Sequence, residues 1–562
     1  MRILYFLRLI RTIKRLRRQK DCHIKTIKQL RQKLRRSGQK SSKDRTESKL
    51  FNPEQVRLLE GHLKRVQRWS DKAMVDSFEM RFACGSKGYN FLRNKKHYPI
   101  PTIRTQQRYL QNLHFDTGIL NEVFELLKIK VQSMSSTDRD CGLVLDEMAI
   151  DQSLSYCNNN KKMFGHSTIP GQTGKATHGL VLMLVGVLSR WKQIVAYHFT
   201  GNTMPDEFLK TLVINVIQRA EELGLKVHFI TTDCGPNNVR MWNNFALSHY
   251  KEHVLDSKPV VHPVRSVDKI EIIPDATHVY KSCVQGWVKN RFIYLPEDIV
   301  AENGLTINVA NIFHLKELVE FEKDRGLKMA SRLTFREVDF MNGIKLDAMK
   351  VCNSYKLVNH SVSAALRFMS AELNRPDLLT TALFIEFVWK WFKLMTSRGN
   401  MYLSLVNFDA YSQAIGFLKS YRFFIYGCKV GGSKRWKPLQ ASTIMCTNSV
   451  LRLQHYFLFS MQHPYICTSR FTQDCVENIF SLLRFKQKRP TALQFKDNLK
   501  LLSVSQFMAE IPSASYEADN REWLINIFEG ISNIHSTTNQ VNLKGSSEVN
   551  NQVNSSYHFR KT

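Results

Sequence analysis

The sequence predicts a multidomain α/β protein, and three observations predict it. Its 562 residues, 43% of them apolar, suffice for roughly three to four folded domains of about 150 residues each. Apolar runs rich in β-branched residues alternate with amphipathic helical patterns in a central stretch, and longer helical patterns lie around it. Lysine and arginine outnumber aspartate and glutamate by 81 to 49, a net charge of +32. This surplus favours a polyanionic partner, nucleic acid first and a membrane surface second, over a merely soluble basic protein.

Residues 1–49 are predicted to form a basic coiled-coil or dimerisation helix and a linker. Apolar residues recur there at heptad spacing. Residues 1–40 hold fifteen lysines and arginines against a single acid, Asp21, so two such helices repel one another unless DNA or another anion neutralises them. A solvated basic helix or a nuclear-import signal is the alternative. The apolar positions are Phe6, Leu9, Ile13, Leu16, Ile27, Leu30 and Leu34.

Residues 50–135 are predicted to be a small helix-turn-helix domain. Helical periodicity covers 52–66 and 71–83, and Pro53 stands near the start of the first helix. The segment 85–101 is rich in turn-forming residues and is expected to connect these helices to a last one.

The last helix of this domain is expected directly after Thr102, which can cap it. A short helix after a tight turn, with arginine and glutamine on its polar face, suits insertion into a DNA major groove. An exposed basic helix that only packs is the alternative. The candidate DNA contacts are Arg104, Thr105 and Arg108.

The region 136–258 alternates in an order that indicates an RNase H-like α/β sheet. Three predicted strands are followed by a helix and a fourth strand. Parallel pairing of the first and fourth strands would bring Asp146, in the first, beside Asp233, at the end of the fourth. The strands are expected at 143–150, 177–188, 193–201 and 226–233, and the helix at 206–224.

Asp146, Asp233 and Glu477 are the candidate catalytic and metal-binding residues. Two strand-borne carboxylates and one helix-borne carboxylate offer the hard oxygen ligands that Mg²⁺ or Mn²⁺ prefers, and such metals act on both oxygens exchanged at a phosphodiester. Carboxylates close together are costly unless a cation lies between them. Each acid also has a plainer interpretation. An aspartate can end a strand for turn reasons, and Asp474 with Glu477 can be a surface acid pair on one helix face.

The chain between the fourth strand and Glu477 is predicted to be an inserted, mostly helical domain at 259–470. The RNase H-like domain then resumes at 471–510, and 511–562 is an Asn/Ser-rich tail that is expected to be partly disordered. Helices of the insertion are expected at 308–324, 335–358, 360–373, 377–395 and 405–427.

Several familiar motifs are missing from the sequence. The eleven cysteines form no C-x-x-C pair, which argues against a zinc ribbon or a dithiol redox motif and for reduced thiols in cytosol or nucleus. The segment 171–176, GQTGKA, lacks the first glycine and the Ser/Thr of a P-loop, so a turn is expected there. The first residues, MRILYFLRLIR, are too short and too charged for a membrane span, and no secretion signal or transmembrane helix is expected.

Four motifs resemble, in order and spacing, the P-element transposase family, which includes the THAP-domain transposases of animals. They are the run at 81–110, LDEMAI around Asp146, TTDCGPN around Asp233, and QDCVENIFSLLR around Glu477. The resemblance covers roughly residues 50–505.

The resemblance implies an RNase H-like DDE transposase that cuts and joins DNA with Mg²⁺, with Asp146, Asp233 and Glu477 as its catalytic triad. It also implies a nuclear protein that binds double-stranded DNA, at transposon ends and target, as a homodimer or higher oligomer. The helical insertion would bind GTP. Asp275, Lys281 and Asp474 would then lie near the nucleotide.

The sequence departs from the family pattern in two places. The C-x₂₋₄-C pair and the later C-x₂-H pair of an N-terminal THAP zinc finger are absent, which weakens the case for recognition of specific transposon ends. The guanine-reading FDxxN motif aligns with 392–396, where Lys393 and Thr396 replace the Asp and Asn, so little selectivity for GTP is expected. The leading hypothesis is a Mg²⁺-dependent transposase. The alternative is a domesticated, transposase-derived DNA-binding protein with little or no catalytic activity.

Overall fold

The structure is a computed structural model that describes residues 51–62, 65–109, 115–157, 161–338, 351–399, 403–432 and 435–508. The chain divides into two units, Met1–Asn112 with Asp519–Thr562, and Leu113–Ala518. The basic helix predicted for 1–49 and the tail predicted for 511–562 lie outside the described residues.

The described part of the first unit is helical, and its helices begin at capping residues. Pro53 is the first residue of its helix, as predicted, after Asn52. The Ser70 hydroxyl accepts from the backbone of Ala73 at 3.3 Å, and the Thr102 hydroxyl accepts from the backbone of Thr105 at 2.9 Å. The helices are α3 (Pro53–Leu59), α4 (Asp71–Asn94) and α5 (Ile103–Tyr109).

Two predicted boundaries in this unit are wrong. Helix α3 stops at Leu59 instead of continuing to 66, because Gly61 adopts φ +78°, a left-handed conformation that ends helices. Helix α4 runs on to Asn94, through the first part of the predicted connector at 85–101. Tyr89 is fully buried, and its hydroxyl donates to the carbonyl of Pro101 at 2.7 Å. Packing therefore outweighs the low helix propensity of the two glycines there.

The second unit is built on a seven-stranded sheet with the order β1-β6-β5-β2-β7-β9-β8. The predicted strand–strand–strand–helix–strand order is present as β2, β5, β6, α7 and β7. The strands are β1 (Gly118–Ile119), β2 (Asp140–Ala149), β5 (His178–Gly186), β6 (Lys192–Thr200), β7 (Lys226–Thr232), β8 (Val260–Val261) and β9 (Lys269–Pro274).

The register of the sheet confirms the predicted parallel pairing. Strand β2 runs antiparallel to β5 and parallel to β7, where Val144 pairs with Thr231 as the last rung. The central strands are buried on both faces, which explains their near-continuous apolar sequence.

The sheet is larger than the predicted domain 136–258 at both ends. Strands β8 and β9 lie beyond 258, and β9 pairs in parallel with β7, so the sheet continues into residues that the sequence assigned to the insertion. At the other end, α6 (Asn121–Ser133) places Phe124 and Leu127 in the core of this unit, so it does not belong to the helix-turn-helix domain predicted to reach 135. No sequence pattern beside the short strand β9 indicates that it pairs with β7.

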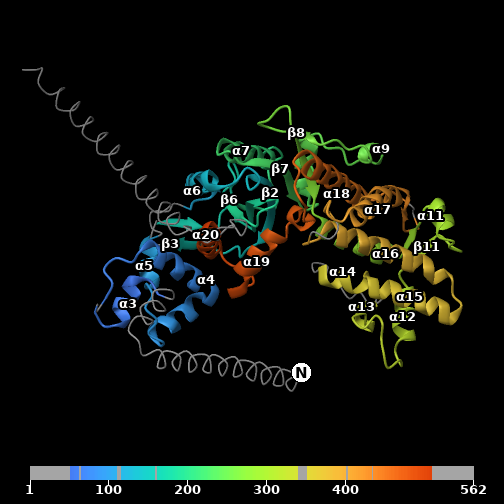
Figure 1. The fold of residues 1–562 in the computed structure, drawn as a ribbon, viewed down its shortest axis with the longest axis horizontal. Helices are drawn as coiled ribbons and strands as arrows, with labels where there is room; N and C mark the ends of the chain where they lie inside the picture. Colours follow the sequence, from blue (N-terminus) through green and yellow to red (C-terminus); the bar gives the residue numbers. More distant parts are fainter. Residues whose placement is uncertain are drawn as a thin grey trace, which may run out of the picture. The chain divides into compact units, whose positions relative to one another are not determined.

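Helices from both ends of this unit's sequence cover the sheet (Figure 1). Helix α18 packs on β9, α19 on β2 and α20 on β6. Helices on both sides of the predicted boundary at 470 therefore lie against the sheet. The helices are α7 (Phe208–Glu222), α8 (Pro236–Asn244), α9 (Lys251–Val254), α10 (Ala276–Asn290), α18 (Pro438–His455), α19 (Asp474–Lys486) and α20 (Ala492–Met508).

The insertion is mostly helical, as predicted. The predicted helices at 360–373 and 377–395 have the observed bounds, whereas 308–324 begins with a strand of the small sheet β11-β10-β12. The helices are α11 (Glu297–Glu302), α12 (His314–Phe321), α13 (Phe335–Val338), α14 (Val351–Leu357), α15 (His360–Leu373), α16 (Asp377–Met395) and α17 (Phe408–Gly427).

Shorter elements complete the second unit. The hairpin β3–β4 follows β2, and the turn predicted at 171–176 is a loop with Gly171 and Gly174 at positive φ. Across the described residues, no helix is both long and apolar enough to cross a membrane. The elements are β3 (Ser155–Cys157), β4 (Lys162–Phe164), β10 (Phe292–Tyr294), β11 (Val309–Asn311), β12 (Lys429–Val430), the π-helix η1 (Tyr456–Ser460) and the 3₁₀ helix η2 (Thr468–Phe471).

Candidate active site

The parallel pairing of β2 with β7 brings Asp146 and Asp233 together. Their last paired rung is Val144 with Thr231, and two further residues along each strand lead to Asp146 and Asp233. Each chain alternates sides at every residue, so both side chains project from the same face at the carboxyl end of β7. This juxtaposition follows from the parallel pairing that the sequence predicted, in the register that the structure shows.

Asp233 is held in place by the turn that follows it. Its Oδ1 accepts from the backbone N–H of Gly235 at 2.8 Å and from the side-chain amide of Asn238 at 2.5 Å. Gly235 precedes Pro236, the first residue of α8, so the strand-to-helix turn itself orients the carboxylate. Both bonds fall on Oδ1, and within the described residues no hydrogen bond to Oδ2 is present.

Among the three candidate acids, Asp146 has the largest pKa shift. Burial raises its pKa, the charge of Asp233 raises it further, and the result is a pKa of about 7. Nearby His278 and the backbone N–H of Glu147, which donates to Asp146 Oδ1 at 2.7 Å, act in the opposite direction. Among the described residues, neither Asp146 nor Asp233 has a salt bridge to lysine or arginine. The pair therefore accumulates negative charge that nothing permanent neutralises.

Glu477, on α19, contacts this region through an ion pair with His278. His278 Nε2 lies 3.8 Å from Glu477 Oε1, while His278 Nδ1 lies 3.0 Å from Asp275 Oδ2. Burial raises the pKa of Glu477, and the charge of Glu477 in turn contributes to the raised pKa of Asp146. Glu477 thus lies on the same side of the sheet as the aspartates and interacts most closely with His278.

Gln473 ties the helix that carries Glu477 to the strand that carries Asp146. Its backbone N–H donates to Asp275 Oδ1 at 2.8 Å, and its side-chain amide donates to the carbonyl of Leu145 at 2.5 Å. Gln473 and Asp275 are both fully buried. Because Asp275 also caps α10 through the backbone N–H of His278 at 2.8 Å, the starts of α10 and α19 are locked to β2.

The donor set at the two aspartates fits a divalent metal ion. Two neighbouring carboxylates, with the pKa of Asp146 raised and no lysine or arginine paired with them among the described residues, are an arrangement that Mg²⁺ or Mn²⁺ stabilises. In the placements that the described residues adopt, however, no three His, Cys, Asp or Glu side chains form a metal-binding group. Asp146 and Asp233, two of the three predicted ligands, lie next to each other. The role of Glu477 as the third ligand stays a prediction.

The residues predicted to bind a nucleotide lie beside the acids. Asp275 uses both oxygens internally, as described above, and Asp474 pairs with Arg398 at 2.9 Å. Lys281 is partly buried on α10, and its charge acts on Glu477. A role for these side chains toward a nucleotide stays a prediction.

Phe392 of the aligned guanine motif packs against the hydrophobic core. The ring of Phe392 stacks on Tyr280 with centroids 4.0 Å apart, and the hydroxyl of Thr396 donates to the carbonyl of Phe392 at 2.7 Å. Phe392 therefore has the plainer role of a core aromatic that its helical spacing suggested.

The predicted DNA contacts occupy the short helix α5 of the first unit. Arg104 and Arg108 are exposed, and Thr105 is partly buried with its hydroxyl 2.8 Å from that of Thr102. Buried Gln106 donates to the carbonyl of Ser77 at 2.8 Å, which fixes α5 on α4. The two arginines are thus presented on a braced helix, and their contact with DNA stays a prediction.

Sequence reasoning missed three residues of the site. His278 bridges Asp275 and Glu477, Asn238 orients Asp233, and Glu147 accepts from the hydroxyl of Thr200 at 2.9 Å, with a pKa raised by burial. His278 lies inside the Asp275–Lys281 segment, and Asn238 lies five residues after Asp233. A search for hydrogen-bond donors next to each candidate acid would have found both of these.

Comparisons with known proteins show which proteins this chain resembles. Residues 115–246 match the family described as TNP-like, RNase H N-terminal domain. The Drosophila melanogaster protein "Transposable element P transposase" is 24% identical over 493 residues, 85% of this chain and 60% of that protein. The chain thus spans about three fifths of the length of this curated relative.

A solved structure shows the same fold. The "Drosophila P element transposase strand transfer complex" matches with a TM-score of 0.69 and 20% identity, over 86% of this chain and 100% of the solved one. The resemblance predicted from four short motifs is confirmed. The chain carries a TNP-like RNase H N-terminal domain and is a homologue of P element transposase.

Proposed function

We propose that this protein is a DNA transposase that cleaves and rejoins DNA by metal-dependent phosphodiester transfer. The observation that carries the proposal is the pair Asp146 and Asp233, brought together on adjacent parallel strands with a pKa of about 7 at Asp146. Homology to P transposase supports a transposase-like function. The matching solved structure is a strand transfer complex, which supports DNA as the substrate.

Asp146 and Asp233 would hold the metal. A bound Mg²⁺ or Mn²⁺ would activate a nucleophilic hydroxyl or water and stabilise the leaving oxygen of the phosphodiester. The chain's own groups prepare the site for it. Gly235 and Asn238 fix one oxygen of Asp233 and leave the other for a ligand, and the half-buried Asp146 gains most from a neighbouring positive charge.

His278 would position Glu477 for the same site. Burial alone would lower the pKa of His278, but the hydrogen bond with Asp275 and the charge of Asp275 outweigh burial, and the pKa is raised. A histidine held by a buried carboxylate is a common way to fix the orientation of a neighbouring ligand group. Glu477 would then complete the acidic set when the metal and DNA draw the three carboxylates together.

The remaining roles follow from the homology and are part of the same proposal. Arg104, Thr105 and Arg108 on α5 would contact duplex DNA, and the chain would act as an oligomer in the nucleus. A nucleotide near Lys281 and Asp474 belongs to this proposal as its least supported element, because Asp275 is fully engaged within the protein.

Cleavage of end-labelled duplex DNA, taken from the sequences flanking the chain's own gene, tests the proposal. The purified full chain should cleave with Mg²⁺ or Mn²⁺ and not with a chelator. Asp146→Asn and Asp233→Asn should abolish cleavage and leave DNA binding unchanged. The exposed Asp409 on α17 offers a matched control, and Asp409→Asn should cleave like the wild type. Equal cleavage by wild type and both site variants would contradict the proposal.

A further inference from the structure

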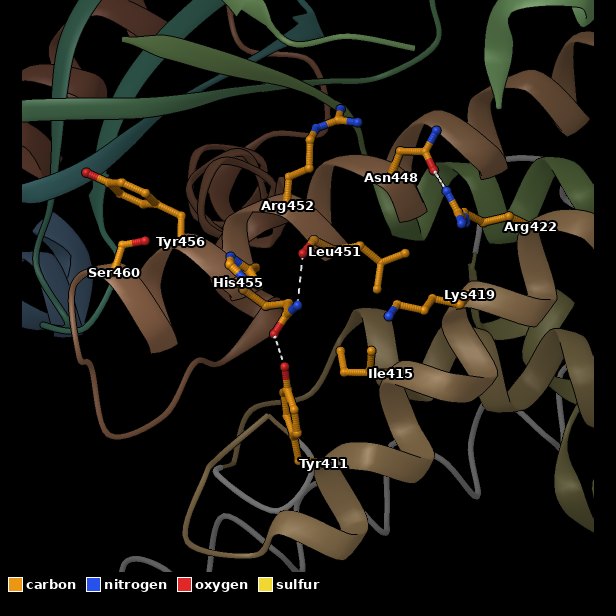
Figure 2. A pocket seen from close by; sticks show the side chains of 11 residues that line it. Tyr411, Ile415, Lys419, Arg422, Asn448, Leu451, Arg452, His455, Tyr456 and Ser460 are labelled. Carbon is orange, nitrogen blue, oxygen red and sulfur yellow. Dashed lines mark hydrogen bonds between the residues drawn. The ribbon is translucent and has the colours of Figure 1, made fainter. Parts of the chain in front are cut away.

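A cavity of about 450 Å³ lies in the second unit, away from the acidic site. It opens between α17, α18 and the π-helix η1 (Figure 2). Its wall holds three permanent cations, Lys419, Arg422 and Arg452, together with His455. A π-helix is rare and is often found at functional sites, and Tyr456 and Ser460 of η1 contribute to this wall.

Arg452 is already neutralised by the sheet. Its guanidinium makes a two-pronged salt bridge with Glu271 of β9, at 2.6 and 2.8 Å, and donates to the carbonyl of Ser257 at 2.9 Å. This pairing satisfies the fork geometry of arginine. Arg452 therefore forms a rigid part of the wall and brings no free charge to the cavity.

Arg422 lies beside it without such a partner. Its Nη1 donates to the amide oxygen of Asn448 at 2.7 Å (Figure 2), and its Nε is buried with no acceptor. Burial lowers the pKa of Arg422, and the charge of Arg452 lowers it further, although Asp256 acts the other way. Within the described residues, no carboxylate lies within salt-bridge distance of Arg422.

Lys419 is a second cation in the cavity wall. It stands three residues before Arg422, so both side chains lie on one face of α17. Lys419 is exposed and forms no salt bridge within the described part of the chain. Uncharged groups supply the rest of the wall, such as Ile415 and the hydroxyl of Tyr411, which donates to Gln454 at 2.8 Å.

We propose that this cavity binds a small phosphorylated molecule, with its phosphate group between Arg422 and Lys419. A half-buried guanidinium with no carboxylate at salt-bridge distance among the described residues favours binding of an anion. An Arg–Lys pair suits the tetrahedral oxygens of phosphate. The volume lies within the range of about 300–1,000 Å³ that is typical of small-molecule sites. The proposal is independent of the nucleotide predicted near Lys281, which does not line this cavity.

Calorimetric titration of the full chain with inorganic pyrophosphate tests this site. The wild type should bind, and Arg422→Gln and the surface change Lys419→Ala should each weaken binding by about tenfold, because each removes charge-assisted hydrogen bonds. The exposed control Lys316→Ala should bind like the wild type. Thermal melting without pyrophosphate shows whether each variant is folded, and Lys419→Ala keeps the test valid if Arg422→Gln is not.

Three results would overturn the proposal. The first is no pyrophosphate binding by the wild type. The second is unchanged affinity in Lys419→Ala, or in folded Arg422→Gln. The third is a short duplex DNA that binds through Lys419 and Arg422 while pyrophosphate does not, which would assign the surface to the DNA backbone instead of to a small molecule.

Discussion

The acidic site at the ends of β2 and β7 and the cationic cavity between α17 and α18 are opposites in charge. At the first, Asp146 and Asp233 repel one another and no lysine or arginine of the described residues pairs with them. At the second, Arg422 lies beside Arg452, and no acid within the described ranges pairs with it. In both places the fold leaves a charged group without a salt-bridged partner among the described residues, which lowers stability unless a ligand of opposite sign binds. A purely structural region would pair its charges, as Arg452 and Glu271 do.

The largest expected effect is on catalysis at the acidic site. Asp146→Asn or Asp233→Asn should lower the rate of metal-dependent DNA cleavage by about a thousandfold or more, since each removes a charge that the metal needs. Single-turnover cleavage assays measure this. If the comparison of the two regions is right, Arg422→Gln should leave the cleavage rate within about twofold of the wild type.

The second effect is on stability: the substitution Asp146→Asn, which should abolish cleavage, should make the metal-free protein more stable. The pKa of Asp146 is about 7 in the folded chain and about 4 when unfolded. The folded state therefore binds more protons between these values, and the metal-free protein should lose stability as pH rises through that window. At about pH 8, Asp146→Asn should raise the free energy of unfolding by about 1–3 kcal/mol.

Denaturant unfolding of the metal-free protein at about pH 5 and about pH 8 checks this prediction. The wild type should be less stable at the higher pH, and the difference should shrink in Asp146→Asn. A wild type that gains stability over this range would show that the acidic site is not under electrostatic stress.

The third effect concerns His278, which lies between Asp275 and Glu477. His278→Ala should lower the cleavage rate by about 10- to 100-fold while DNA affinity stays the same, because Glu477 loses its positioning partner. The exposed His166 provides the control, and His166→Ala should cleave normally. A variant His278→Ala with the wild-type rate and pH profile would mean that the histidine only packs.

The smallest effect is expected on α5. Arg104→Ala and Arg108→Ala should each weaken binding of duplex DNA by a few-fold and reduce its salt dependence by about one counterion. Affinity measured at several salt concentrations tests this. An affinity independent of salt in the wild type would contradict an electrostatic interface.

Patterns within short stretches of sequence were enough to predict several helices and the order of the central strands. The helices at 360–373 and 377–395 were predicted with their observed bounds, because both have a helical pattern of apolar residues. The proximity of Asp146 and Asp233 was predictable because the order of strands and helix indicated an RNase H-like sheet, in which the first and fourth strands would pair in parallel. These inferences needed no knowledge of distant contacts.

Features that depend on distant contacts could not be predicted. Strand β9 joins the sheet only through its pairing with β7, and α6 joins the second unit only through its packing. The Asp275–His278–Glu477 connection spans about two hundred residues of chain. The salt bridge between Arg452 and Glu271 spans a similar length. Such features follow from tertiary packing, which no window of sequence contains.

Binding of Mn²⁺ to the purified full chain tests the central claim, that Asp146 and Asp233 share a divalent cation, most directly. Titration followed by electron paramagnetic resonance counts the bound ion. The wild type and Asp409→Asn should bind it with equal affinity, and Asp146→Asn and Asp233→Asn should each lose it. Equal Mn²⁺ binding by the wild type and the two site variants, or no binding by any of them, would contradict the claim.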